Sequence, residues 1–160
     1  MQSKTAPARV AGVDVRGPRF AAWLTTAVLG LVLIISAVSP AAGAVALSIQ
    51  AVVFAVGAAL GPRRHPYGLL FSTFVSPRLG PVCERAALPP LKFAQLVGFV
   101  FAVYGVAGFA VGPVAVGVGA TSFALAAAFL NAAFGICLGC QLYPLLARLR
   151  PGAVPASLLM

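Results

Sequence analysis

One pair of side chains in the sequence has evident chemical potential, namely Cys137 and Cys140 in Phe134-Gly-Ile-Cys-Leu-Gly-Cys-Gln-Leu-Tyr143. A C-x-x-C pair can cycle between a dithiol and a disulfide, or give two thiolates to a soft metal ion. Buried cysteines are also ordinary small apolar residues, so inert packing is a third interpretation. The remaining cysteine, Cys83, is a weaker candidate for a relay thiol that exchanges with the pair, or for a three-thiolate metal site completed by His65.

Other kinds of catalytic site find little support. Asp14 and Glu84 are the only acidic residues in the chain, which leaves little scope for general acid–base catalysis by paired carboxylates. The sequence also contains no phosphate-binding loop and no nucleophile motif. Sulfur is therefore the chemistry to consider. No cofactor and no bound metal is predicted, and whether the protein is an enzyme stays open.

The composition indicates the elements that must position the cysteines. Of the 160 residues, 61% are apolar and 8% are charged, against roughly 45–50% and 25% in soluble domains. Four uncharged apolar runs are each long enough to cross about 30 Å of hydrocarbon as a helix, and they lack the alternation typical of barrel strands. We predict an all-α integral membrane protein of two helical hairpins, with transmembrane spans at 20–38, 41–60, 93–111 and 115–146.

The chain divides into one membrane domain and two tails. We expect a flexible N-terminal tail at 1–12, a single four-helix membrane domain at 13–149 and a C-terminal tail at 150–160. The loop at 61–92 is long and apolar, with aromatic residues between basic flanks, which predicts a segment that lies in the membrane interface and covers the cytoplasmic helix ends. His65, the only histidine, is expected to be an unpaired surface residue.

The basic residues determine the expected orientation. They lie before the first span, between the second and third, and after the fourth: Lys4, Arg9, Arg16, Arg19, Arg63, Arg64, Arg78, Arg85, Lys92, Arg148 and Arg150. Basic loops favour the cytoplasm, so both termini are expected there, in a multi-pass protein of a bacterial cytoplasmic membrane. The net charge of +9 thus indicates topology and contact with the lipid bilayer, and no nucleic acid. A signal peptide cleaved near Ala44 is the alternative for the first span, which is longer than a usual signal-peptide core.

The end of the fourth span does not suit an unbroken helix. Residues three apart on a helix have Cβ atoms about 5–6 Å apart, whereas a disulfide needs about 3.5–4.5 Å. Gly135, Gly139 and Pro144 weaken the helix around the cysteines, so we expect a kink, or a short interfacial helix after the pair. Counted from Arg148, the cysteines would lie roughly 12–17 Å from the cytoplasmic boundary. Only a break in the helix would bring Asn131 to the thiols.

Small and polar residues are expected to hold the helices together, because small residues four apart let helix backbones approach closely in lipid. Such spacings occur at Gly57/Gly61, Gly108/Gly112, Gly135/Gly139 and in the ladder Ala120, Ala124, Ala128, Ala132. Gln50, Gln95 and Asn131 are expected to form hydrogen bonds between helices.

Two landmarks repeat at an offset of 73 residues. Arg19-Phe-Ala opens the first hairpin and Lys92-Phe-Ala the second, while Pro40 and Pro113 mark the two outer turns. Chance similarity between apolar hairpins is one explanation. The other is a pair of parallel hairpins, an arrangement that some transport proteins use.

The sequence also resembles a family of uncharacterised bacterial membrane proteins, domain of unknown function 4395, over most of residues 13–149. The matching segments are Val13-Asp-Val-Arg-Gly-Pro-Arg-Phe20, His65-Pro-Tyr67, Lys92-Phe-Ala-Gln-Leu-Val-Gly98 and Phe134–Tyr143. Lys92 stands where that family is expected to have Arg. The resemblance implies a four-helix membrane protein with a C-L-G-C signature and no established activity, whose relatives occur near thioredoxin-like or sulfurtransferase genes.

These observations predict a thiol–disulfide or sulfur-relay component of the membrane. Cys137 and Cys140, at the cytoplasmic half of the fourth helix, would exchange electrons or sulfur with a cytoplasmic thioredoxin-like or sulfurtransferase protein. The alternative is a non-enzymatic transport component or membrane scaffold with structural cysteines.

Overall fold

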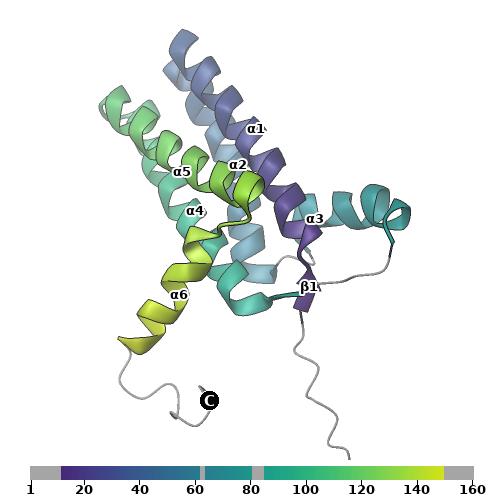
Figure 1. The fold of residues 1–160 in the computed structure, drawn as a ribbon. Coiled ribbons are helices and arrows are strands. Elements are labelled where there is room, and N and C mark those ends of the chain that lie inside the picture. Colours follow the sequence, from purple (N-terminus) through teal and green to yellow (C-terminus); the bar gives the residue numbers. More distant parts are fainter. Residues whose placement is uncertain (1–11, 62–63, 81–84, 150–160) are drawn as a thin grey trace, which may run out of the picture.

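The computed structural model describes residues 12–61, 64–80 and 85–149, and most of these residues are helical (Figure 1). The helices are α1 (Arg16–Val38), α2 (Pro40–Leu60), α3 (Pro66–Leu70), α4 (Leu88–Ala110), α5 (Val114–Phe134) and α6 (Leu138–Arg148), with a π-helical turn at Phe71–Val75 and a 3-10 turn at Ser76–Arg78. Two short strands that the sequence did not predict, β1 (Gly12–Asp14) and β2 (Arg85–Ala87), pair in antiparallel fashion with Asp14 opposite Arg85.

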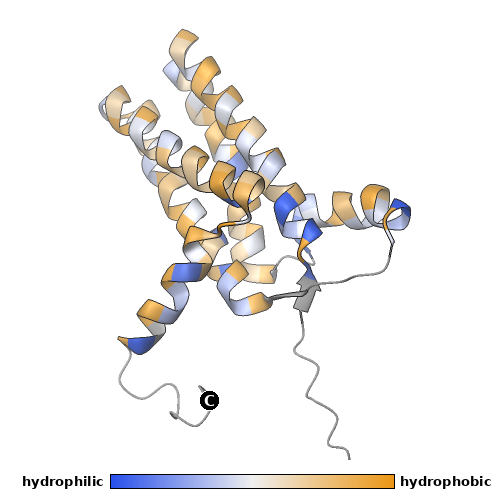
Figure 2. Ribbon diagram, in the orientation of Figure 1, coloured by the Kyte–Doolittle hydropathy of each residue, from blue (hydrophilic) through white to orange (hydrophobic). Residues whose placement is uncertain are grey.

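Four of these helices, α1, α2, α4 and α5, are long and apolar enough to cross a membrane. The predicted all-α fold with four spans is therefore confirmed. In Figure 2 the long helices are mostly apolar, and strongly hydrophilic positions gather at the start of α1, in α6 and near the tip of the segment that follows α3. Large apolar side chains point outward, with Ile34 and Phe123 each 68% exposed, which suits surfaces in contact with lipid.

Two predicted span boundaries differ from the observed helices. Helix α4 begins at Leu88, inside the expected loop 61–92, because prolines such as Pro89 and Pro90 are tolerated in the first turn of a helix. The expected span 115–146 is two helices, α5 and α6, with a break between Phe134 and Leu138. Their separation leaves α5 alone as the fourth span.

Each hairpin turns sharply between its long helices. Ser39 has an extended backbone, and its side-chain oxygen accepts a hydrogen bond from the Ala42 N–H at 3.3 Å. Pro40 then occupies the first turn of α2, where no backbone donor is needed. The second hairpin turns at Gly112 and Pro113, and Pro113 takes the extended N-cap position of α5.

The hairpins pack against each other through α1 with α5 and α2 with α4, and within the second hairpin α4 packs against α5. Leu29, Val32 and Leu47 are fully buried between them. Where α4 crosses α5, Gly108 lies against the backbone of Gly117, so closely that a Cβ on Gly108 would overlap it. The predicted small-residue packing at Gly108 therefore serves this crossing.

The basic landmarks of the two hairpins make equivalent contacts. Arg19 at the start of α1 donates to the carbonyl oxygens of Ala132 and Ala133, at 3.2 and 3.3 Å, near the end of α5. Lys92 near the start of α4 donates to the carbonyl oxygen of Ala59 at 3.1 Å, near the end of α2. Arg19 and Lys92 are 73 positions apart, and so are Ala59 and Ala132. Each hairpin thus caps the last turn of the other hairpin's second helix, as cations do at helix C-termini.

Adding one methyl group at the α4–α5 crossing should destabilise the fold. We expect Gly108→Ala to lower the free energy of unfolding by about 1–3 kcal/mol because the new Cβ meets the backbone of Gly117. Gly119→Ala is the matched control on α5, since nothing lies within 4 Å of its Cβ position. Unfolding in detergent micelles measures both variants, and equal stabilities would contradict the crossing described here.

Candidate functional site

The two cysteines of the C-x-x-C pair are joined by a disulfide between Cys137 and Cys140, with Cα atoms 5.2 Å apart. The chain reaches this geometry because α5 stops before it. Gly135 caps α5 in the left-handed conformation, with φ at 70°, which glycine adopts without steric cost. Its N–H and that of Ile136 donate to the carbonyl oxygens of Asn131 and Leu130. The helix is thus interrupted at Gly135, one of the residues predicted to weaken it.

Cys137 stands at the amino end of α6, which begins at the next residue. The backbone N–H of Cys140 donates to the sulfur of Cys137 at 3.3 Å, as an N-cap side chain accepts from the third residue of a helix. An N–H donor and the positive end of a helix both favour a thiolate. After reduction, Cys137 is therefore the sulfur that this geometry stabilises as the anion.

Pro144 was predicted to weaken the helix around the cysteines, but it does not interrupt a helix in the structure. Helix α6 continues through it from Leu138 to Arg148. The break lies three residues before Leu138, at the glycine cap, so Pro144 removes only one hydrogen bond from a helix that has already started. The short helix after α5 packs on α4, where Gly139 lies against the backbone of Ala94.

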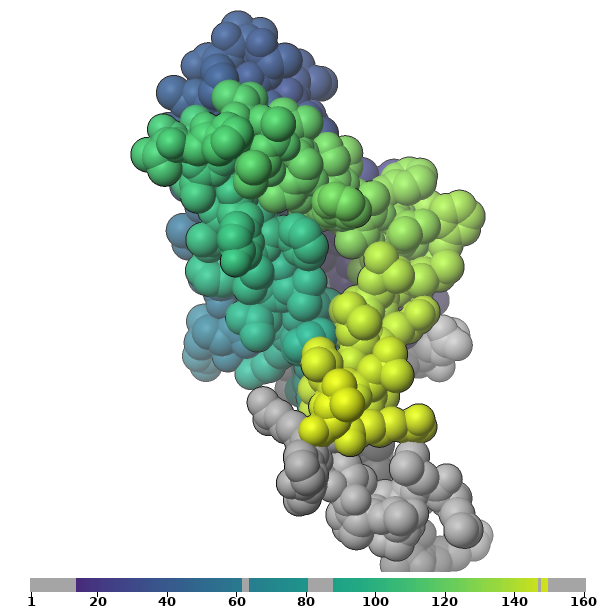
Figure 3. All heavy atoms as spheres, turned by 90° about the vertical axis from the view of Figure 1, so that its left-hand side faces the viewer, coloured from purple at the N-terminus to yellow at the C-terminus, as the bar shows by residue number. Residues whose placement is uncertain are grey.

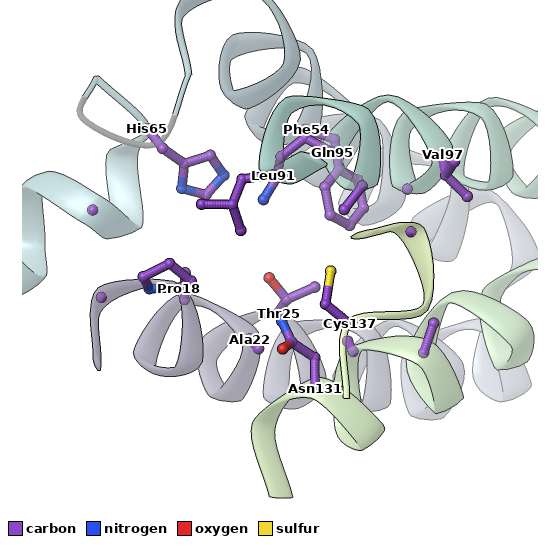
Figure 4. A pocket seen from close by; sticks show the side chains of 18 of the residues that line it. Pro18, Ala22, Thr25, Phe54, His65, Leu91, Gln95, Val97, Asn131 and Cys137 are labelled. Atoms are coloured by element: carbon purple, nitrogen blue, oxygen red, sulfur yellow. The ribbon is translucent and has the colours of Figure 1, made fainter. Parts of the chain in front are cut away.

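The disulfide borders a cavity of about 470 Å³. Its walls come from α1, α4 and α5, with α6 and the residues before α3 closing the end. Many lining residues are small, among them Gly17, Ala21, Ala22, Gly98, Ala124 and Ala128. Figure 4 shows Cys137 with its sulfur directed into the space, Asn131 and Thr25 beside it, and His65 on the opposite wall. Part of the alanine ladder thus makes room for the cavity.

The break also decides the place of Asn131. On an unbroken helix, Asn131 and Cys137 would occupy different faces. The chain instead turns after Phe134, and Asn131 and Cys137 line the same cavity. The prediction that only a break in the helix would bring Asn131 near Cys137 therefore agrees with the structure.

His65 is buried, with 2% of its surface exposed, so the expectation of an unpaired surface histidine was wrong. Gly57 makes the room for it, since a Cβ there would overlap the imidazole ring and press on the Gln95 side chain. Burial lowers the pKa of His65 from 6.5 to about 4, while Gln95 opposes the shift. Nevertheless, within the part of the chain that the structure describes, Nε2 of His65 and Oε1 of Gln95 have no hydrogen-bond partner of good geometry. His65 is therefore a neutral imidazole at physiological pH.

A second polar contact joins α3 to α2. The Tyr67 hydroxyl donates to Oε1 of Gln50 at 2.7 Å, and Gln50 is 1% exposed. The partner of Gln50 comes from the short helix α3, so the hydrogen bond between helices that the sequence predicts for Gln50 is present. The Tyr67 ring stands edge-on to His65, with ring centres 5.2 Å apart, and burial raises the pKa of its hydroxyl.

The weaker thiol candidate has no described position. Cys83 lies outside the described residues, as does Glu84. Within the described ranges, no group of three or more His, Cys, Asp or Glu side chains is placed to hold a metal ion. His65 and Gln95 are the cavity residues whose importance the sequence analysis missed. Both residues could have been noticed, because His65 and Gln95 lie in segments that carry the family resemblance.

Comparison with known proteins gives one match. The sequence profile of the family described as Domain of unknown function (DUF4395) matches residues 13–148. No curated protein and no solved structure matches the chain.

The buried imidazole should make stability depend on pH. The unfolded chain binds a proton at His65 below about pH 6.5, whereas the folded chain resists it down to about pH 4. Stability should therefore be level above pH 6.5 and fall by about 3 kcal/mol toward pH 4. Unfolding in micelles across this range tests the expectation. His65→Gln should flatten the curve between pH 6.5 and 4, and an unchanged slope in that variant would contradict it.

Proposed function

Since the chain belongs to the DUF4395 family, and the description of that family names no activity, we propose a function from the site itself. The protein is a membrane thiol–disulfide component, and its Cys137–Cys140 pair exchanges electrons with a thioredoxin-like dithiol protein on the cytoplasmic side. The observation that carries this proposal is the disulfide at the start of α6, on the wall of a cavity. A disulfide favours electron transfer over sulfur relay, because a carrier needs a free thiol to receive sulfur.

The exchange proceeds by two substitutions at sulfur. A thiolate of the partner attacks one sulfur of the pair and forms a mixed disulfide, while the other cysteine leaves as a thiolate. The partner's second thiolate then attacks the mixed disulfide. The partner ends as a disulfide, two electrons pass to Cys137 and Cys140, and protons from solvent complete the thiols. The amide of Cys140 and the α6 dipole stabilise Cys137 as leaving group or nucleophile.

The pair should titrate as one two-electron couple. We expect maleimide labelling of membranes poised between about −320 and −120 mV to change from two reactive thiols to none at Cys137 and Cys140. Cys137→Ser and Cys140→Ser should each leave one thiol that is labelled throughout. Cys83→Ser is the control, and it should preserve the transition if Cys83 is not a relay. A pair that stays in one state over the whole range would refute the proposed function.

A transport or scaffold role is the second candidate. The crossed caps of Arg19 and Lys92 at equivalent carbonyls favour it, since repeated hairpins around a central site occur in transporters. The double change Cys137→Ala with Cys140→Ala separates the candidates. A transporter or scaffold would retain its cellular phenotype, whereas a thiol–disulfide component would lose it.

We further propose that the cysteine end of the bundle faces the cytoplasm of a bacterial cell. The basic residues of the described ranges gather at this end, from the start of α1 to the end of α6: Arg16, Arg19, Arg64, Arg78, Arg85, Lys92 and Arg148. The turns at the other end carry no charge. The positive-inside rule then assigns the basic end to the cytoplasm.

Single cysteines in a chain without the native three should reveal this orientation. Val38→Cys and Val111→Cys stand at the uncharged turns and are 89% and 90% exposed, while Leu149→Cys lies beyond α6 and is 77% exposed. A membrane-impermeant maleimide should label the first two on intact spheroplasts and the third only after lysis. The reverse pattern would invert the proposed orientation.

A further inference from the structure

We infer that the cavity beside Cys137 binds the ring of an isoprenoid quinone, and that the quinone takes the electrons of the reduced pair. This inference rests on the proposed function, because it supplies the second half of the redox cycle. A pair that is reduced by a partner must be oxidised again before it can accept more electrons. In this step Cys137 and Cys140 lose two electrons and two protons and form their disulfide, while the quinone gains both and becomes a quinol.

The volume and the walls of the cavity suit such a ring. About 470 Å³ falls in the range of small-molecule sites. The space arises because residues on three spans lack long side chains, among them Ala22 on α1, Gly98 on α4 and Ala128 on α5. Among the described lining residues, Asp14 is the only charged one when His65 is neutral. Phosphorylated or otherwise anionic cofactors are therefore poor candidates, whereas an uncharged aromatic ring fits.

The cavity opens in a direction that favours a ligand dissolved in lipid. Figure 3 shows a hollow between α4 and the segment of α5 and α6, with atoms of α1 visible behind it. Val97, Phe101 and Phe123 belong to the cavity lining, and Phe123 is largely exposed on the outer surface of a span. The opening thus lies between helices rather than along the bundle axis. An isoprenoid tail could remain in the bilayer while the ring enters sideways.

The polar atoms of the cavity match the oxygens of a quinone. His65 is 98% buried, and among the described residues neither its Nε2 nor Oε1 of Gln95 has a hydrogen-bond partner of good geometry. Unpaired polar atoms at such depth are costly, and a ligand that pairs them gains affinity. The Nε2–H tautomer of His65 can donate to a quinone carbonyl, and Gln95 can accept from a quinol hydroxyl. Across the space, Asn131 and the sulfur of Cys137 face the same ring (Figure 4).

In this inference, electrons pass from the cysteine pair on one wall of the cavity to a quinone ring held by His65 on the other. Cys137 immediately precedes α6, its sulfur accepts a hydrogen bond from the Cys140 N–H, and that sulfur points into the cavity. Cys140 follows it on the first turn of α6, ready to close the disulfide. His65 on the opposite wall holds the quinone oxygen that becomes protonated. The neutral imidazole positions the ring and adds no charge to an apolar site.

The full chain in nanodiscs tests the inference with decylubiquinone, whose fully substituted ring leaves thiols no position for addition. Protein reduced with dithiothreitol and freed from it without oxygen should form one quinol per disulfide, followed by ultraviolet absorbance and by maleimide labelling. Decylubiquinone should also raise the unfolding temperature of the oxidised protein. Ala128→Phe fills the cavity and should slow quinol formation about tenfold or more and abolish the thermal shift.

Ala126→Phe is the matched control, since Ala126 is exposed on α5 and does not line the cavity. Ala126→Phe should keep the wild-type rate of quinol formation and the wild-type increase in unfolding temperature. Ala127→Phe, at another lining position, replaces Ala128→Phe if that variant does not fold. A pair that titrates in redox buffers but is neither oxidised nor stabilised by the quinone, or equal effects of both phenylalanines, would overturn the quinone site and leave the proposed function intact. A pair that does not titrate at all refutes the proposed function instead.

Discussion

A helix that ends within an apolar bundle leaves its last carbonyl groups without N–H partners, and α5 ends in this way at Phe134. Two contacts supply the missing donors. The N–H groups after the left-handed Gly135 turn back to the helix, and the guanidinium of Arg19 donates to the carbonyls of Ala132 and Ala133. The position of the disulfide depends on this cap, because only a chain that has left α5 can place Cys137 at the start of a new helix.

The same constraint gives the basic residues a second role. In the sequence they predict the orientation in the membrane, and in the fold Arg19 and Lys92 also donate to helix-end carbonyls of the opposite hairpin. Each therefore ties one hairpin to the other at the end of the bundle that holds the cysteines. The offset of 73 residues between the two cations is shared by the two alanine carbonyls they meet, so the likeness between hairpins extends from sequence to contacts.

Two features of the cavity cost stability in the folded protein. Small side chains on α1, α4 and α5 leave space that dispersion contacts would otherwise fill, and His65 and Gln95 bring to it polar atoms that have no partner of good geometry among the described residues. Both features lower the stability of the folded protein. Glycine at position 57 permits the arrangement, because any side chain there would push His65 out of the wall.

The sequence by itself determined the four apolar helices long enough to span a membrane and singled out the two cysteines that the fold joins, since apolar run length and the C-x-x-C spacing are local properties. It also located the weak point of the last span, because the left-handed conformation at Gly135 is a property of glycine. The burial of His65, its place opposite Cys137, the position of Asn131 on the same cavity and the pairing of β1 with β2 came only from the tertiary structure. These features join residues that are far apart in the chain, and their positions depend on how helices pack and where their ends are capped. No local pattern carries that information.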